Sequence, residues 1–279
     1  MRLRSSMIAG GTLALTLLAQ TPAPAQDQPA QPAAGTASAS EHRLFLRFIE
    51  DAAVVPSFWL EGQLDFLTNG EGFDPSGSGA GEADLRRLGG VFAFNVAEDF
   101  EFGGSLMYLH RDPDDGDSDQ GLGDLDIWGK IKVVQDPLDV TFGLLVSLPT
   151  GDSDEFLGTG ETDLEFFGSV RQDHSSFSWT ANAGIRINQD PDFPGTSIEG
   201  NSSVLLGGGV IFPLGRNWAI IGETAWETER YDGTKNSLQL GGGFDWRMGD
   251  AFMVRGSGFA GLTDGAPDVE FIGSFVWIF

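Results

Sequence analysis

Hydrophobic and polar residues alternate one by one along most of the chain after residue 56. Twelve stretches show this period of two, which places successive side chains on opposite faces of a β-strand. Each stretch is about nine to eleven residues long, the length that a tilted strand needs to cross a bilayer. The stretches are 58–67, 88–96, 100–109, 125–133, 140–148, 162–170, 177–187, 204–212, 218–226, 238–246, 252–261 and 271–279.

One face of these predicted strands avoids charge completely. None of its sixty-one positions is Asp, Glu, Lys or Arg, although 20% of the chain is charged. A face of this kind needs a non-aqueous neighbour, which is either the core of a soluble sandwich or the lipid of a membrane. The other face carries twelve charged residues: Glu61, Asp65, Glu101, Asp126, Lys130, Lys132, Asp163, Glu165, Arg186, Glu223, Asp245 and Arg255.

The connections between the stretches favour the membrane. They alternate between short turns, such as 97–99 and 135–137, and mostly longer loops rich in Asp and Gly, such as 68–84 and 111–121. This alternation around an even number of strands is typical of bacterial outer-membrane barrels. Closure into a barrel also removes unpaired strand edges, which lipid cannot satisfy. We therefore expect an all-β fold, a closed antiparallel transmembrane β-barrel of about 12 strands over residues 56–279.

The last predicted strand is rich in aromatic residues. Phe271, Phe275, Trp277 and Phe279 all fall on its charge-free face. An aromatic closing strand that ends in Phe resembles the signal by which bacterial outer-membrane barrels are recognised for insertion. We expect these four residues to form an assembly signal read by the barrel-assembly machinery.

The sequence before the barrel predicts export. Residues 1–25 combine two arginines, an apolar run at 7–18 and a small-residue site, which predicts a cleaved signal peptide. Residues 26–40 are mainly Pro, Ala, Gln and Ser and predict a disordered linker. We therefore expect a cell outer-membrane protein with both termini in the periplasm and with outer-membrane lipid and lipopolysaccharide as partners.

Residues 41–55 form an N-terminal amphipathic segment. Leu44, Phe48 and Ala52 repeat at four-residue spacing, which favours a short helix over an additional strand. Such a helix or plug segment could lie in the barrel mouth or in the periplasm.

Composition excludes several kinds of chemistry. The chain has no cysteine, so it has no lipoprotein anchor, disulfide, thiolate metal site or cysteine nucleophile. Its formal net charge of −25 argues against nucleic acid as a partner. No phosphate-binding loop, zinc motif or dinucleotide fingerprint is present, and no cofactor is expected.

Several segments resemble a known family. These are 54–66, Gly121 to Val134 with its GLGD turn, Val146 to Val170 with its LPTGD strand exit, and the closing strand. They are similar to the phenol-degradation meta-pathway outer-membrane protein family. The resemblance covers most of residues 54–279 and implies a barrel transporter for small solutes, aromatic or other hydrophobic compounds among them. It carries over no binding residues.

The twelve charged residues of the polar face are candidates for lining the lumen. A twelve-stranded barrel is narrower than an open porin, so a narrow, partly filled pore is expected. In one interpretation, Lys130, Lys132, Arg186 and Arg255 oppose Asp126, Asp163, Glu165 and Glu223 across a constriction. In the other, the charges are structural pairs that stabilise the polar interior that any barrel requires.

Two further candidates come from short motifs. Asp115, Asp117 and Asp119 are spaced like a calcium loop, but the glycine is displaced to Gly121 and no helices flank them, so they are weak metal candidates. The alternative is a solvated loop that bridges divalent cations to lipopolysaccharide. His174 precedes two serines in an expected periplasmic turn, a poor place to preorganise a nucleophile and its base.

We therefore predict a passive channel for small, hydrophobic or aromatic solutes, and no enzyme. The alternatives are a structural or surface-adhesion barrel without transport and an outer-membrane lipid hydrolase.

Overall fold

The chain forms a closed antiparallel β-barrel. The computed structural model describes residues 42–68, 83–113, 117–193 and 198–279, and these residues contain thirteen strands and no helix. The strands are β1 (Phe58–Thr68), β2 (Ala83–Ala97), β3 (Phe100–Pro113), β4 (Asp119–Leu122), β5 (Leu125–Val134), β6 (Asp139–Leu148), β7 (Asp163–Asp173), β8 (Ser178–Ile187), β9 (Ser202–Leu214), β10 (Trp218–Glu227), β11 (Ser237–Arg247), β12 (Phe252–Gly261) and β13 (Val269–Ile278).

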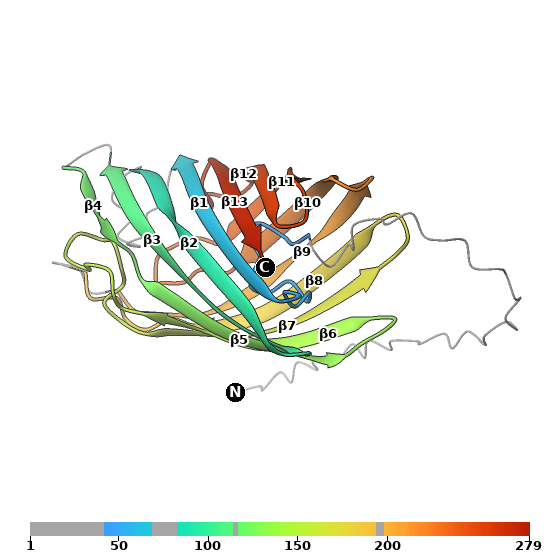
Figure 1. Cartoon of the computed structure of the whole chain (residues 1–279). Helices are drawn as coiled ribbons and strands as arrows, with labels where there is room; N and C mark the ends of the chain where they lie inside the picture. The colour runs from blue at the N-terminus through green and yellow to red at the C-terminus, as the bar shows by residue number, and fades with distance from the viewer. Residues whose placement is uncertain (1–41, 69–82, 114–116, 194–197) are drawn as a thin grey trace, which may run out of the picture. The chain divides into compact units, whose positions relative to one another are not determined.

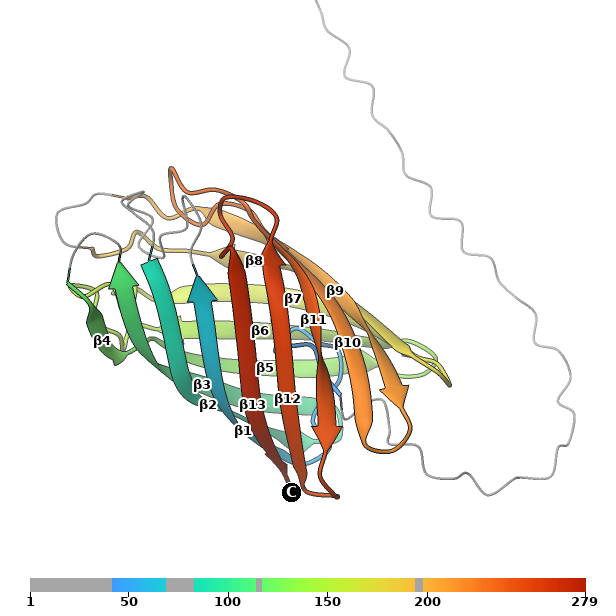
Figure 2. The ribbon, with the colours of Figure 1, turned by 90° about the horizontal axis from the view of Figure 1, so that it is seen from above.

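Apart from β4, each strand pairs with the strands before and after it, and the first and last strands close the circle. β1 pairs with β2 on one side and with β13 on the other, as Figures 1 and 2 show. β4 and β5 lie one after the other along β3, so together they occupy one place in the sheet. The prediction of an all-β barrel of about twelve strands is therefore confirmed.

The sheet is taller at the long-loop end than the sequence pattern predicted. β2 begins at Ala83 and β3 ends at Pro113, and both are paired over this extension. β4 was expected to be part of a loop, but it continues the pairing of β3 from Tyr108 to Arg111. The extension carries Asp84 and Arg86 on the outer face, where the bilayer-length strands carry no charge.

The two faces of the sheet have opposite chemistry. Phe166 and Ile185 lie opposite each other on the outer face and are 52% and 53% exposed, whereas Glu165, next to Phe166 in the sequence, is 1% exposed on the inner face. The same alternation runs through all the long strands, because a period of two holds wherever one face meets lipid and the other the lumen.

Aromatic side chains gather at the short-turn end of the outer face. Trp218 stacks on Trp246 with ring centroids 5.4 Å apart, and Phe252 stacks on Trp277 at 5.7 Å. Phe279 stacks on Trp277 at 4.2 Å and also meets Phe58 of β1. A band at this level is where outer-membrane barrels place their interfacial aromatics.

The four residues of the expected assembly signal belong to this outer surface. Phe271, Phe275, Trp277 and Phe279 are between 41% and 57% exposed. Phe271 lies opposite Gly258, and its ring fills the space that this glycine leaves. Their role in assembly stays a prediction.

The expected signal peptide (1–25) and linker (26–40) lie outside the described residues. Within the described ranges, no helix has the length and apolar character needed to cross a membrane.

Candidate functional site in the lumen

Residues 42–57, which we call the plug, lie inside the barrel. Leu44, Ala52 and Val55 are almost completely buried against the inner face of the sheet. The plug appears as the blue segment enclosed by the strands in Figures 1 and 2. The structure therefore shows a plug segment, which the sequence had left open as an alternative. The prediction of a short helix was wrong, because the segment consists of turns.

A wall carboxylate replaces the hydrogen bonds that a helix would make internally. Glu223 of β10 accepts three successive backbone N–H groups, from Phe45 at 2.7 Å, Leu46 at 3.2 Å and Arg47 at 2.7 Å. Asp51 accepts two more, from Leu44 and Ala53. Buried backbone donors must be satisfied, and here the carboxylates satisfy them while the segment follows a series of turns.

Glu101 of β3 is the centre of the strongest anchor. Its carboxylate lies 2.6 Å from Arg43 Nη2 and 3.3 Å from Lys130 Nζ, and it accepts the N–H of Val55 at 2.7 Å. Lys130 also donates to the carbonyls of Ile49 and Asp51. All three charged side chains are at most 1% exposed, and removing one partner of such a buried pair costs about 3–5 kcal/mol.

Two further anchors hold the plug on other sides. Arg255 of β12 pairs with Asp245 at 2.9 Å and donates to the carbonyl of Arg43 at 2.5 Å, and Asp245 contacts His42 at 2.9 Å. Arg171 of β7 donates to Asp51 at 3.1 Å and to the carbonyl of His42.

The carboxyl of Asp51 is kept ionised inside the lumen. Burial disfavours its charged form, but Arg171 and Arg43 outweigh burial and hold the pKa of Asp51 below its ordinary value. Asp51 therefore stays charged around neutral pH.

Apolar side chains of the plug pack against both sides of the lumen. Phe48 packs with Trp59 and Trp128, and Leu44 and Phe45 pack with Ile211, Ile221 and Phe259. Leu44 and Phe48, whose four-residue spacing predicted one face of a helix, therefore pack against different parts of the lumen wall.

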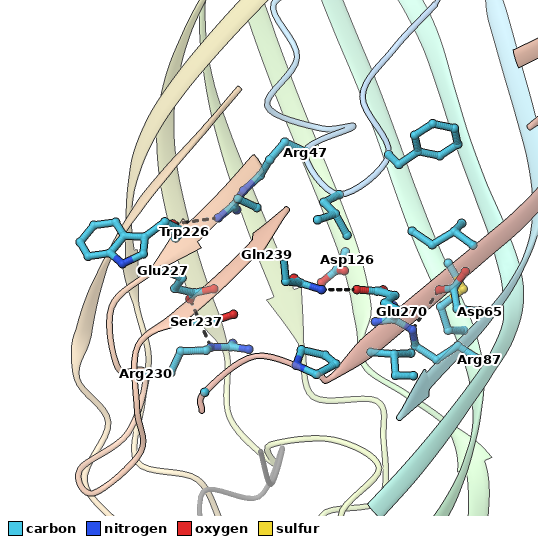
Figure 3. Close-up of a pocket in the computed structure, with 18 of the residues that line it drawn as sticks. Arg47, Asp65, Arg87, Asp126, Trp226, Glu227, Arg230, Ser237, Gln239 and Glu270 are labelled. Atoms are coloured by element: carbon cyan, nitrogen blue, oxygen red, sulfur yellow. Dashed lines mark hydrogen bonds and ion pairs between the residues drawn. The ribbon is translucent and has the colours of Figure 1, made fainter. Parts of the chain in front are cut away.

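Above the plug, towards the long loops, the lumen widens into a cavity of about 430 Å³, which we call the vestibule (Figure 3). Phe45, Leu46 and Arg47 of the plug form its floor. Its walls come from β1, β2, β3, β5, β10, β11 and β13 and from the loops after β10 and β12.

A smaller cavity of about 140 Å³, the side cavity, lies against the plug and adjoins the vestibule. It shares Phe45, Leu46, Gln63, Ser105, Met107 and Ile272 with the vestibule. The rest of its lining consists of the apolar Phe48, Ile49, Val91 and Trp128 and of the ion pair between Glu61 and Arg255.

Most wall charges pair between adjacent strands in register. Glu101 lies opposite Lys130, Glu165 opposite Arg186, Asp245 opposite Arg255, and Asp65 opposite Arg87. These pairs lie side by side along the wall, whereas the sequence interpretation placed opposing charges across a constriction.

The remaining wall charges have separate partners. Arg87 forms ion pairs with both Asp65 and Glu270. Glu61 accepts a hydrogen bond from the indole N–H of Trp59. Lys132 pairs with Asp139 at 2.5 Å near a short turn. Asp163 accepts the N–H of Gln189 at 3.0 Å and lies 3.4 Å from Arg230.

Sequence reasoning missed inner-face charges just beyond the predicted strands. Arg87, Arg171, Glu227 and Glu270 each continue the inward alternation of their strand by one step. Extending each stretch by two residues would have found them. The charges of the plug, Arg43 and Asp51 above all, gave no such signal because they lie outside the alternating region.

The weak metal candidates do not form a cluster in the described part of the chain. Asp115 lies outside the described residues, and no group of three or more His, Asp or Glu side chains suited to a metal ion occurs within them. His174 lies in the exposed turn after β7, where its ring packs on Phe177 at 4.8 Å.

The two motifs behind the family resemblance meet in space. Asp124 of the GLGD turn accepts the N–H groups of Gly151 and Thr159, each at 3.0 Å, and Thr150 donates to the carbonyl of Gly123 at 2.9 Å. The aspartate therefore clamps the loop after β6 onto the junction between β4 and β5.

We expect Asp124→Ala to make this loop roughly ten times more sensitive to a glutamate-specific protease that cuts after Glu155, because two hydrogen bonds to a charged group are lost. Cleavage would be followed on gels of the folded barrel. Asp154→Ala is the matched control, since Asp154 is exposed in the same loop. Equal cleavage of the two variants would contradict the clamp.

No protein-family model matches the chain, and no curated protein matches its sequence. Its structure is similar to the COG4313 outer membrane channel from Pseudomonas putida F1, with a TM-score of 0.62 and 12% identity over 82% of this chain and 98% of that chain. It is also similar to the KdgM porin, with a TM-score of 0.51 and 6% identity over 79% of this chain and 99% of that chain. A third similar structure is the NanC porin, with a TM-score of 0.50 and 11% identity over 80% of this chain and 99% of that chain. At these identities the likeness shows a shared fold, that of outer-membrane β-barrels, and the resemblance to the phenol-degradation family stays a prediction.

Proposed function

We propose that this chain is an outer-membrane channel through which small solutes cross passively, past a plug that narrows its lumen. The observation that carries the proposal is that the vestibule and the side cavity adjoin each other beside the plug, since six residues line both. A polar vestibule next to a partly apolar cavity suits small molecules that are partly hydrophobic. Aromatic compounds fit this description, and the family resemblance points to them as well.

The outer membrane is the proposed location. An apolar outer face with an aromatic band needs lipid around it, and lipopolysaccharide would contact the side of the long loops. In this orientation the short turns and both termini lie in the periplasm, the signal peptide having been removed. The neighbours in structure include porins, which supports the same orientation.

Transport explains the lumen better than the alternatives. A purely structural barrel needs a polar interior, but it has no use for two adjoining cavities inside its lumen. Hydrolysis would require a nucleophile and a base held together, and the suggested His174 and Ser175 lie in an exposed turn at the end of β7. We therefore propose no enzymatic activity.

Ion conductance in planar bilayers tests the proposal. The purified barrel should show a small, steady conductance, and Lys130→Ala should raise it severalfold because Lys130 holds two plug carbonyls. Arg186→Ala is the matched control, since Arg186 pairs with Glu165 and Glu227 of the wall and should change ion selectivity more than conductance. A barrel that stays closed to ions and to small aromatic solutes in all three forms would overturn the channel.

A further inference from the structure

The vestibule contains one carboxylate without a basic partner. Three of its four acids are neutralised: Asp65 and Glu270 by Arg87, and Glu227 by Arg186 at 3.0 Å. The fourth acid is Asp126 of β5. Among the described residues no Lys or Arg forms an ion pair with it, and its partners are hydroxyl groups.

The register of the sheet explains this difference. Where Glu101, Glu165 and Asp245 face a basic residue on an adjacent strand, Asp126 faces Ser105 of β3 and Ser147 of β6. Ser105 donates to its carboxylate at 3.3 Å, and Ser147 donates as well. Arg186 acts on Asp126 only through its field, because its guanidinium is bound to Glu165 and Glu227.

Asp126 also stands at the junction of the two cavities. It lines the vestibule, and its hydrogen-bond partner Ser105 lines both the vestibule and the side cavity. Next to Ser105, Met107 also belongs to both cavities, and the apolar ring of Phe48 and the indole of Trp128 lie further along the side cavity. Asp126 is therefore placed next to a recess that offers aromatic surface and whose own charges, Glu61 and Arg255, pair with each other.

The size of the recess fits one ring. Its volume of about 140 Å³ is close to that of an engineered apolar cavity that binds benzene. Two amide side chains face the same vestibule: Gln63 and Gln239 donate their N–H groups to Asp65 and Glu270, which leaves each carbonyl oxygen as an acceptor. Acceptors of this kind suit a ligand that carries several N–H donors.

We infer that Asp126 binds the ammonium group of small amphipathic organic cations, whose apolar body enters the side cavity. Resting on the proposed function, this inference names the class of solute that the channel prefers. The formal net charge of −25 favours the approach of cations to the protein over that of anions.

Three probes of nearly equal shape test the inference: benzylamine, which is a cation near pH 7, benzoate, its anionic counterpart, and benzyl alcohol, which is neutral. Binding to the purified barrel in detergent is measured by calorimetric titration at low salt, where charge interactions are least screened. We expect saturable binding of benzylammonium at least roughly tenfold tighter than of either other probe, the size expected for a hydrogen bond to a charged group.

Variants then assign the binding to one carboxylate. Asp126→Asn should weaken benzylammonium binding roughly tenfold or more and leave benzyl alcohol unchanged, whereas Asp126→Glu should retain the preference for the cation. Asp154→Asn is the matched control, because it removes the same charge from an exposed loop position. Heat-modifiable migration on gels verifies that each barrel is folded.

Equal binding of the three probes, or cation binding that persists in Asp126→Asn, would overturn the inference. Binding in detergent does not depend on transport. If the barrel binds benzylammonium at Asp126 but never conducts, the proposed channel is rejected and the binding site is retained. If the barrel conducts but does not prefer the cation, the channel is retained and the binding site is rejected.

Discussion

Deletion of residues 43–53 should raise the single-channel conductance of the purified barrel roughly tenfold, because an emptied twelve-stranded barrel is wider than the filled eight-stranded kind. The segment removed carries most of the plug, including Arg43, Asp51 and the backbone that Glu223 binds. Wall charges such as Glu101 and Arg171 would then be hydrated by water that enters the lumen. Planar-bilayer recording of the variant against the full chain measures the change.

A deletion of equal length in the expected linker, 27–37, is the control for shortening the chain. It should leave the conductance at the level of the full-length protein. If the plug deletion gives too little folded barrel, Arg43→Ala provides a milder form, in which Glu101 keeps Lys130 as a partner and the plug is loosened. Conductances that match the full chain in both plug variants would show that residues 43–53 do not obstruct the pore.

The second large effect is expected at the seam of the barrel. Phe279→Ala should reduce the fraction of chains that reach the folded, heat-modifiable form severalfold, because Phe279 joins the two strands that close the sheet. Its ring stacks on Trp277 and meets Phe58 of β1 at 5.3 Å, and its N–H donates to the carbonyl of Phe58 at 3.1 Å. Refolding into lipid vesicles, followed by gel mobility with and without heating, gives the folded fraction.

Phe142→Ala is a matched control for the loss of a lipid-facing ring. Phe142 is 54% exposed on β6, compared with 56% for Phe279, and it lies far from the seam in the sheet order. Lumen variants such as Lys130→Ala should also assemble better than Phe279→Ala. If Phe279→Ala assembles as well as Phe142→Ala, the ring has no special part in closure.

The fold was predictable because lipid imposes a strict rule on one face of every strand. A single charged residue on the outer face at bilayer depth is costly, so the face from Leu60 to Phe279 excludes charge and the alternation becomes visible in one sequence. The same rule ends where the bilayer ends. Predicted strands were therefore cut at bilayer length, and Arg87 and Glu270, which line the vestibule, fell just outside them.

The plug was less predictable because its conformation is set by residues far away in the sequence. The repeat of Leu44, Phe48 and Ala52 is a local signal for a helix, but Glu223, which fixes the turns of the plug, lies 178 positions after Phe45. Likewise, alternation shows that Asp126 points inward but not that both neighbours in register are serines. The register between adjacent strands decides which charges are neutralised. This register is known only from the three-dimensional structure.

The position of the plug also has a consequence for the order in which the barrel assembles. Its partners come from β3, β5, β7, β10, β11 and β12, so its full set of bonds can form only as the sheet curls around it. Residues 42–57 then serve as a template for curvature as well as an obstruction. A barrel that closes around this segment already has a narrowed lumen when its first and last strands meet, so a wide, empty pore is not expected at any stage of assembly.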